Sequence, residues 1–360
     1  MMNTFNTDLH CDLLAYLLRA NTSVDDGQPG CSLPYLKKGH VKLQVMAIYA
    51  STGSGSFHNG IRQSEIFREF LNSNDFFLFY EHNINIPEYA DKVGVISAIE
   101  NASAFCEEDM DLDAGFKNLE TIIQNTRKIF YMGITHHTEN RFGGGNFTDT
   151  GLKEDGKVLI DYISDRKIAI DLAHTSDQLA YDILNYLDRK NYSVPILASH
   201  SNYRSVYDNK RNLPDELVQE LIRRKGLIGL NFIKDYIDHG HPERLYEHIQ
   251  YALSLGAENC IAYGGDFFYD KEHPDQSRIP FFFDEFKDAT AYNTINKKIS
   301  EDFSPGNHGK DKPSECPGFS SQERYLIFQS SCILDLPLDD FNNIYMLHLG
   351  FYPSMDINVQ

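Results

Sequence analysis

A set of ionisable side chains falls where short apolar segments of the sequence end. If these segments are parallel strands of a barrel, their carboxyl ends meet on one face, and side chains far apart in sequence become neighbours. Imidazole nitrogens and carboxylate oxygens together suit Zn²⁺ or another first-row divalent ion. The set comprises His10, Asp12, Glu100, His136, His137, His174, His200 and Asp266.

Local spacing supports two members of this set. In an extended strand His10 and Asp12 point to the same side, because side-chain direction repeats every two residues. Glu100 follows the apolar run Val-Gly-Val-Ile-Ser-Ala-Ile, and a carboxylate there is costly to bury unless it bridges cations. A single histidine at a strand end is more often a hydrogen-bonded structural residue than a ligand, so the prediction depends on the joint placement.

The remaining histidines receive weaker interpretations. His137 is expected to face away from His136 in an extended segment, where it supports the site or meets solvent. His248 is interpreted as a packing residue on a helix. No role is assigned to the histidines in loops and other helices, which are His40, His58, His82, His239, His241, His273, His308 and His348.

Strand and helix patterns alternate eight times along the chain. The clearest strands are 41–49, 93–99, 167–173, 194–198, 226–230 and 260–263, and helices are expected at 59–72, 115–127, 175–190, 214–225 and 242–256. Ser176 is placed to cap the third of these helices. The eight strands end near His10, Tyr49, Glu100, Thr135, Ala173, Ser199, Asn231 and Asp266.

Eight such repeats favour a closed (β/α)8 TIM barrel of the metal-dependent hydrolase type. A doubly wound sheet is the main alternative, but it needs a glycine-rich phosphate-binding turn after its first strand, and His10-Cys11-Asp12 supplies none. The glycine run 143–145 follows a polar stretch and opens no helix, so it is interpreted as a flexible loop.

The last part of the chain differs in composition. We expect the barrel to occupy residues 1–299 and a C-terminal helical extension, residues 300–360, to pack on it. Residues 300–318 are rich in Pro, Gly, Lys and Asp and predict an exposed loop. Two short amphipathic helices are predicted after the loop, at 324–335 and 339–349.

Composition excludes several classes of partner. Of 360 residues, 33 are Lys or Arg and 52 are Asp or Glu, which gives a formal charge of −19. A surface this acidic repels nucleic acids and anionic membranes. We expect no export signal, spanning segment or lipid anchor. Six scattered cysteines without a C-x-x-C pair argue for free thiols and a cytoplasmic location.

Eight short motifs resemble the membrane (renal) dipeptidase family of zinc peptidases, within the amidohydrolase superfamily. They occur in the family's order over roughly residues 5 to 270. Individually each is short, and their combination is specific. The motifs are Asp8-Leu-His-Cys-Asp-Leu-Leu14, Ala98-Ile-Glu100, Gly133-Ile-Thr-His136, Ile170-Asp-Leu-Ala-His-Thr-Ser176, Ala198-Ser-His-Ser201, Lys210-Arg-Asn-Leu-Pro-Asp-Glu216, 226–231 and Gly264-Gly-Asp-Phe267.

The resemblance implies a role for each matching residue. His10 and Asp12 would hold one zinc ion, His174 and His200 a second, and Glu100 would bridge the two. His136 would polarise the scissile carbonyl. Arg211 and Asn231 would bind substrate, Arg211 through the substrate's terminal carboxylate. Asp266 would carry protons between the attacking water and the leaving amine. Homodimerisation is an expectation from the family alone.

Three departures from the family surround the substrate rather than the metals. Asn101, Ala102 and Ser103 stand where relatives have two glycines and a histidine. Phe268 and Tyr269 replace Asp-Gly, and Ile233 replaces an aromatic residue. The leading hypothesis is hydrolysis of dipeptides, including those with a D-residue at the carboxyl end. The alternatives are an amidohydrolase for another small amide, such as an N-acyl amino acid, and a non-catalytic binding homologue.

Overall fold

A computed structural model describes residues 6–79, 91–271 and 273–302. Eight parallel strands form a nearly closed barrel, in the order β7-β6-β5-β4-β2-β1-β9-β8. A parallel bridge between Ala198 and Ile228 links the two outermost strands of this order. The fold is therefore the (β/α)8 barrel that the sequence predicts. Its strands are β1 (Asn6–Cys11), β2 (Val41–Tyr49), β4 (Val93–Glu100), β5 (Ile129–Gly133), β6 (Ala169–Asp171), β7 (Ile196–Leu197), β8 (Ile228–Leu230) and β9 (Ile261–Tyr263).

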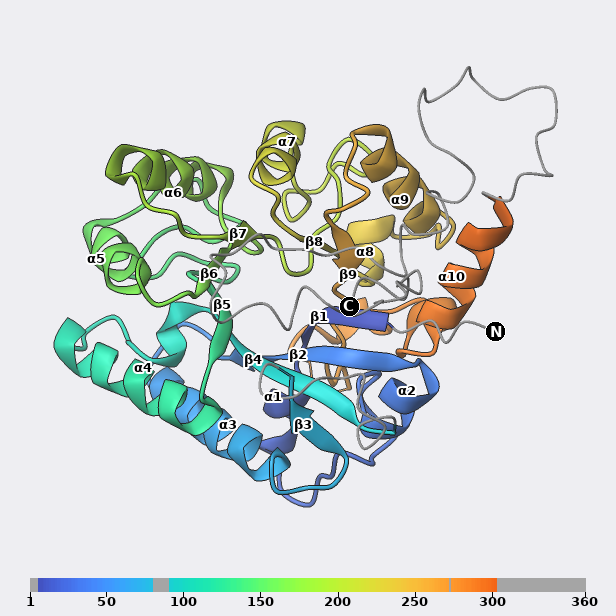
Figure 1. Cartoon of the computed structure of the whole chain (residues 1–360), viewed down its shortest axis with the longest axis horizontal. Coiled ribbons are helices and arrows are strands. Elements are labelled where there is room, and N and C mark those ends of the chain that lie inside the picture. Colours follow the sequence, from blue (N-terminus) through green and yellow to red (C-terminus); the bar gives the residue numbers. More distant parts are fainter. Residues whose placement is uncertain (1–5, 80–90, 272, 303–360) are drawn as a thin grey trace, which may run out of the picture.

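Helices surround the strands (Figure 1). The α6 helix begins after Ser176, whose hydroxyl accepts a hydrogen bond from Leu179 N at 2.9 Å, so the predicted cap is confirmed. Among the described residues, no helix is long and apolar enough to cross a membrane. The helices are α1 (Leu13–Leu17), α2 (Leu33–Lys38), α3 (Ser56–Phe70), α4 (Leu112–Thr126), α5 (Glu154–Ile163), α6 (Asp177–Lys190), α7 (Asp215–Arg223), α8 (Lys234–Ile237), α9 (Arg244–Ser254) and α10 (Ala291–Asp302).

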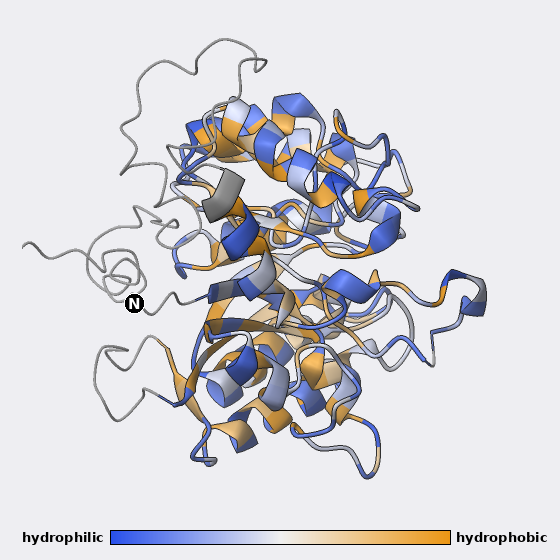
Figure 2. Cartoon of the chain, turned by 90° about the vertical axis from the view of Figure 1, so that its right-hand side faces the viewer, coloured by the Kyte–Doolittle hydropathy of each residue, from blue (hydrophilic) through white to orange (hydrophobic). Residues whose placement is uncertain are grey.

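The apolar core has two layers. One cluster of buried residues comes only from strands and the segments beside them, and it includes Leu9, Val45 and Ile96. Because side chains alternate across a strand, this cluster fills the barrel interior. The larger cluster joins the opposite strand faces to the helices. In Figure 2 the central strands are mostly hydrophobic, whereas the helices around them carry both kinds of residue.

The structure differs from the sequence prediction at two segments. A short strand, β3 (Phe76–Leu78), pairs with the first half of β4, and the sequence analysis missed it. The α10 helix continues to Asp302, so the loop predicted to begin at Ser300 is helical in its first three residues. The helices predicted at 324–335 and 339–349 lie outside the described residues, and the domain boundary stays a prediction.

The glycine run 143–145 is packed rather than flexible. All three glycines are buried, and a Cβ on Gly145 would lie 2.2 Å from the carbonyl oxygen of His136. A side chain cannot be accommodated there without moving the backbone. Because these residues have no side chains, the loop lies directly against the segment that carries His136. The prediction of a flexible loop was therefore wrong.

His248 on α9 is buried in the outer core, as its predicted packing role requires. Its Nδ1 accepts a hydrogen bond from Tyr203 N at 3.3 Å, and its Nε2 lies 3.0 Å from the carbonyl oxygen of Ile237. Burial is the main cause that lowers the pKa of His248 to about 4. The neutral ring is therefore the form that the fold accepts.

We predict that His248 contributes to loss of stability in acid. The pKa of the folded state lies below the unfolded value, so the contribution is present above pH 6.5 and is lost as pH falls towards 4. Full loss amounts to about 3 kcal/mol. Denaturant unfolding of the chelator-treated protein between pH 7 and 4.5 should show a shallower decline for His248→Gln than for the native chain. The exposed control His58→Gln should follow the native curve, and identical slopes for all three proteins would contradict the prediction.

Candidate active site

Glu100 lies at the centre of a group of histidines at the carboxyl ends of the strands. It is the last residue of β4 and is 3% exposed. Its Oε1 lies 3.0 Å from His174 Nε2 and 3.4 Å from His200 Nε2, whereas its Oε2 lies 3.5 Å from His10 Nε2. The barrel therefore brings together four of the predicted ligand residues, from β1, β4 and the segments after β6 and β7.

Two aspartates extend this group on the side of His10. His10 Nε2 lies 3.8 Å from Asp266 Oδ1, and ligand atoms of His10, Asp12 and Asp266 all lie within 4.8 Å of one another. Asp12 Oδ1 and His10 Nε2 are buried without a hydrogen-bond partner among the described residues. Buried polar atoms without a partner are costly, so this end of the site favours an additional polar or charged occupant.

Hydrogen bonds on the far side of His10 set the proton position of its ring. The Tyr131 hydroxyl donates to the carbonyl oxygen of Leu9 at 2.9 Å. It lies 2.7 Å from His10 Nδ1 and must therefore accept a hydrogen bond from a protonated Nδ1. The Nε2 of His10 then carries a lone pair directed towards the carboxylates.

His200 is oriented in the same way. The Ser199 hydroxyl donates to Asp171 Oδ2 at 2.5 Å and accepts from His200 Nδ1 at 2.6 Å. Asp171 also accepts from the backbone N–H groups of Ala173 and Ser199, which fixes its position. His200 therefore also presents an Nε2 lone pair to Glu100.

Asn146 supports two histidines at once. Its Oδ1 lies 3.0 Å from both His174 Nδ1 and His137 Nδ1. An amide oxygen only accepts, so both rings carry their proton on Nδ1 and leave Nε2 unprotonated. Asn146 follows directly after the packed glycine run 143–145, which places it beneath these rings.

The resulting electrostatic arrangement fits a bound cation. The lone pairs of His174 Nε2 and His200 Nε2 face each other at 2.9 Å. Burial lowers the pKa of both rings well below the usual value, so protonation does not relieve their repulsion. Burial also raises the pKa of Glu100 to about 8, and a bound cation would favour the ionised carboxylate over the neutral acid. Neutral imidazoles and an ionised carboxylate are the ligands that a divalent metal ion requires.

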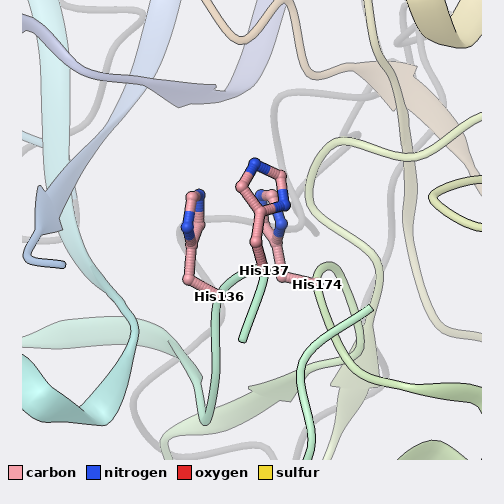
Figure 3. Close-up of side chains that lie close together, drawn as sticks. All are labelled: His136, His137 and His174. Atoms are coloured by element: carbon pink, nitrogen blue, oxygen red, sulfur yellow. The ribbon is translucent and has the colours of Figure 1, made fainter. Parts of the chain in front are cut away.

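His137 does not face away from His136 as the sequence analysis expected. The ring centroids of His136 and His137 lie 4.0 Å apart, and those of His136 and His174 lie 4.2 Å apart. Figure 3 shows the three rings side by side. The chain leaves β5 before His136 and does not continue as a strand, so the alternation that holds in extended strands does not apply here.

The backbone is left-handed at two site residues. His174 has φ +62° and Asp266 has φ +58°, values that residues other than glycine seldom adopt. Asp266 is held by its amide N–H, which donates to the carbonyl oxygen of His10 at 3.2 Å. Such conformations are kept only where surrounding contacts demand them, and here they turn both side chains towards Glu100.

Asn101 shows how the chain departs from the family beside Glu100. It has φ +71°, which a glycine adopts readily. Its Oδ1 accepts from Ser103 N at 3.2 Å and its Nδ2 donates to Ala50 O at 2.8 Å. These bonds hold a non-glycine residue in the left-handed region, so Glu100 keeps its place at the end of β4.

Arg211 and Asn231 lie behind the site. Arg211 is 3% exposed, and its Nη groups donate to Ser201 Oγ and to the carbonyl oxygen of His200, both at 2.8 Å. Asn231 Nδ2 donates to Asp266 Oδ2 at 2.8 Å. Neither residue lines the cavity over the site, and their predicted contacts with substrate stay predictions. Burial raises the pKa of Asp266 to about 6.

A cavity of about 590 Å³ opens over Glu100, His136 and Asp266. Sequence reasoning missed most of its wall, because most of these residues lie in loops or in the short helices α1 and α8, which no periodic pattern predicts. His273, to which the sequence analysis assigned no role, is one of them. The wall includes Tyr16, Arg19, Tyr49, Tyr236, Phe268, Tyr269, His273, Arg278 and Phe281.

Comparison with curated proteins finds dipeptidases among the relatives. An uncharacterised dipeptidase of Schizosaccharomyces pombe is 28% identical over 147 residues, 38% of this chain and 34% of that protein. An uncharacterised protein of Klebsiella pneumoniae is 28% identical over 49% of this chain and 66% of its own. A dipeptidase of Aspergillus oryzae is 21% identical over 70% and 62%. The chain thus spans less than two thirds of the length of these relatives.

Two solved structures share the fold. A dipeptidase described as a metallopeptidase of family M19 superposes with a TM-score of 0.69 at 19% identity. A metallopeptidase of Rhodobacter sphaeroides, bound to a phosphinate mimic of the dipeptide L-Ala-D-Ala, superposes with a TM-score of 0.67 at 19% identity. In both cases 96% of this chain and 98% of the other are covered.

The sequence model that describes the membrane dipeptidases, peptidase family M19, matches residues 1–303. This match includes all the residues that converge on Glu100 and ends just after α10. The chain therefore belongs to the membrane dipeptidase family.

Proposed function

We propose that this chain is a metal-dependent dipeptidase that binds two divalent metal ions, with zinc the expected metal. The observation that carries the proposal is the convergence of three unprotonated Nε2 atoms on the buried carboxylate of Glu100. Under this proposal, His10 and Asp12 would hold one ion, His174 and His200 would hold the other, and Glu100 would be a ligand to both. When bound, such ions polarise a carbonyl group and lower the pKa of water.

Asp266 is proposed to carry the proton in this reaction. It faces the cavity, and burial raises its pKa to about 6, so both protonation states are accessible near neutral pH. A group of this kind can accept a proton from water and deliver it to a leaving amine. Asn231 positions it by donating to Oδ2, which leaves Oδ1 directed towards His10.

His136 is proposed to bind the oxygen of the scissile carbonyl. Its ring lines the cavity beside Tyr49, at a centroid distance of 5.0 Å. Burial lowers the pKa of His136 well below its usual value, so the ring is neutral and one nitrogen carries a proton. A neutral N–H donor at this position can stabilise negative charge that develops on the carbonyl oxygen.

The similarity of relatives supports a dipeptide as substrate, since several are dipeptidases and one solved structure holds a dipeptide mimic. The volume of the cavity, about 590 Å³, lies in the range of small-molecule sites. Cytoplasmic location and homodimerisation stay predictions of the sequence.

Metal analysis and a substrate panel test the proposal together. The purified chain should bind two zinc ions, lose activity on chelation and regain it with added zinc. Alanyl dipeptides of L,L and L,D configuration should be hydrolysed, whereas N-acetylalanine should not. Hydrolysis of N-acetylalanine alone would favour the amidohydrolase alternative, and absence of metal binding would favour a non-catalytic homologue.

Replacing Asp266 with asparagine should separate metal binding from catalysis. The substitution removes the proton carrier but retains a side chain of the same size, so both metal ions should remain while kcat falls by about 10² to 10⁴. Asp284→Asn is a matched control, since that side chain is 95% exposed. Unchanged turnover in Asp266→Asn would remove this residue from the mechanism.

Replacing Tyr131 with phenylalanine should weaken metal binding. The hydroxyl that fixes the proton of His10 on Nδ1 is lost, and losses of this kind reduce metal affinity by about 10- to 100-fold. Chelator competition would measure the change. Tyr162→Phe serves as control, because that hydroxyl bonds to Glu120 at the outer helices. Equal affinities in the three proteins would show that Tyr131 does not orient a ligand.

A further inference from the structure

Away from the group around Glu100, the charged residues of the cavity wall are arginines. Among the described residues that line it, the acids are Asp12, Glu100 and Asp266, all of which belong to the group around the proposed metals. The other charged residues of the wall are Arg19 and Arg278. The chain as a whole carries a formal charge of −19, so this part of the wall differs from the average surface.

Arg278 is held in a defined position at this wall. Its Nε donates to Asp235 Oδ2 at 2.7 Å, and its guanidinium lies 4.8 Å from the ring centroid of Phe281. The hydroxyl of Tyr236 is a further hydrogen-bond partner. A guanidinium has five N–H donors, more than these two contacts use. The Arg278 side chain is 28% exposed, so it reaches the cavity.

Asp235 is the ion-pair partner of Arg278 and contacts it through Nε. Its other carboxylate oxygen lies 2.8 Å from His239 Nδ1, so the carboxylate is shared between two partners. Asp235 is not among the residues that line the cavity, whereas Arg278 is. An anion in the cavity would therefore meet the guanidinium rather than the carboxylate.

Arg19 adds a second cation on another part of the wall. Its guanidinium lies 4.8 Å from the ring centroid of Tyr269, and Tyr16 and Tyr269 pack together at 5.2 Å. Both arginines thus lie against aromatic rings of the wall, an arrangement that favours a guanidinium in a fixed plane. Such a plane suits recognition of a carboxylate.

An ordinary dipeptide is a zwitterion without net charge. An acidic side chain adds one carboxylate to it. A wall that presents guanidinium N–H donors favours a substrate with such an additional carboxylate.

We propose that the preferred substrates are dipeptides with an acidic side chain, and that Arg278 binds the carboxylate of that side chain. This inference rests on the proposed dipeptidase function. It assigns to Arg278 a specificity role that no sequence motif indicates, because Arg278 lies in a short 3-10 turn, residues Gln276–Arg278, after β9.

Two pairs of substrates that differ in charge but not in shape test the proposal. Zinc-loaded enzyme would be assayed with Ala-Glu against Ala-Gln, and with Glu-Ala against Gln-Ala. In at least one pair the acidic dipeptide should have a kcat/KM about tenfold higher or more, the range expected when a hydrogen bond to a charged group is gained. Ratios near one in both pairs would overturn the inference and leave the dipeptidase proposal standing.

Variants of Arg278 identify the group responsible. Arg278→Gln should bring the ratio of acidic to neutral kcat/KM close to one, and Arg278→Lys, which keeps the charge, should retain part of the ratio. Arg62→Gln is the control, since Arg62 lies on α3 with a side chain that is 69% exposed, and should change neither rate. A ratio that Arg278→Gln leaves as high as in the native chain would overturn the assignment.

A binding measurement keeps the two proposals separable. If the enzyme hydrolyses none of the four dipeptides, the proposed function fails, and calorimetric titration with the same two pairs decides the inference alone. Tighter binding of the acidic dipeptide in at least one pair, lost in Arg278→Gln, would support it. Equal binding within both pairs would overturn it.

Discussion

The site depends on the burial of one carboxylate, Glu100, among imidazoles that cannot neutralise it by taking up a proton. Burial raises the pKa of Glu100 and lowers that of His174 and His200, so each group alone favours its neutral form. A cation reverses this preference for Glu100, because it stabilises the ionised carboxylate and accepts the ring lone pairs. The barrel holds these groups together against their mutual repulsion. A bound metal ion would remove this repulsion, and the free energy so gained would add to the affinity for the metal.

The hydrogen-bond partners of the histidine rings determine which ring nitrogen faces Glu100. Tyr131, Ser199 and Asn146 each accept a hydrogen bond from the Nδ1 of a ring. Each is fixed by its own position, Tyr131 within β5, Ser199 after β7 and Asn146 after the packed glycine run. A ligand histidine without such a partner could present either nitrogen. The orientation of three rings is therefore determined by hydroxyl and amide groups, not by the rings.

The sequence predicted the convergence of the acids and imidazoles well and the wall poorly, for a physical reason. Glu100 and His10 follow apolar strands, and strand ends of a barrel must converge, so their proximity follows from the fold. Tyr131 and Ser199 lie in or beside those strands, and only their hydrogen bonds distinguish them from core residues. His137 was placed wrongly, because the alternation of an extended strand was applied beyond the end of β5. Arg278 and His273 lie in a loop whose path no periodicity predicts.

The residues around Glu100 and many residues of the cavity wall come from different parts of the fold. The groups around Glu100 lie in or shortly after strands that also build the core, so a change among them would disturb both the fold and the proposed metal site. Phe268, His273 and Arg278 lie on a segment after β9 that contacts the core mainly through aromatic rings, such as Phe268 against Phe281 at 5.1 Å. Because the wall contributes less to the core, its charge can change while the chemistry stays the same. Phe268 and Tyr269, where this segment departs from the family pattern, both line the cavity. Tyr269 and Phe281 are rings against which the guanidinium groups of Arg19 and Arg278 lie, so the aromatic residues of the wall position its two cations.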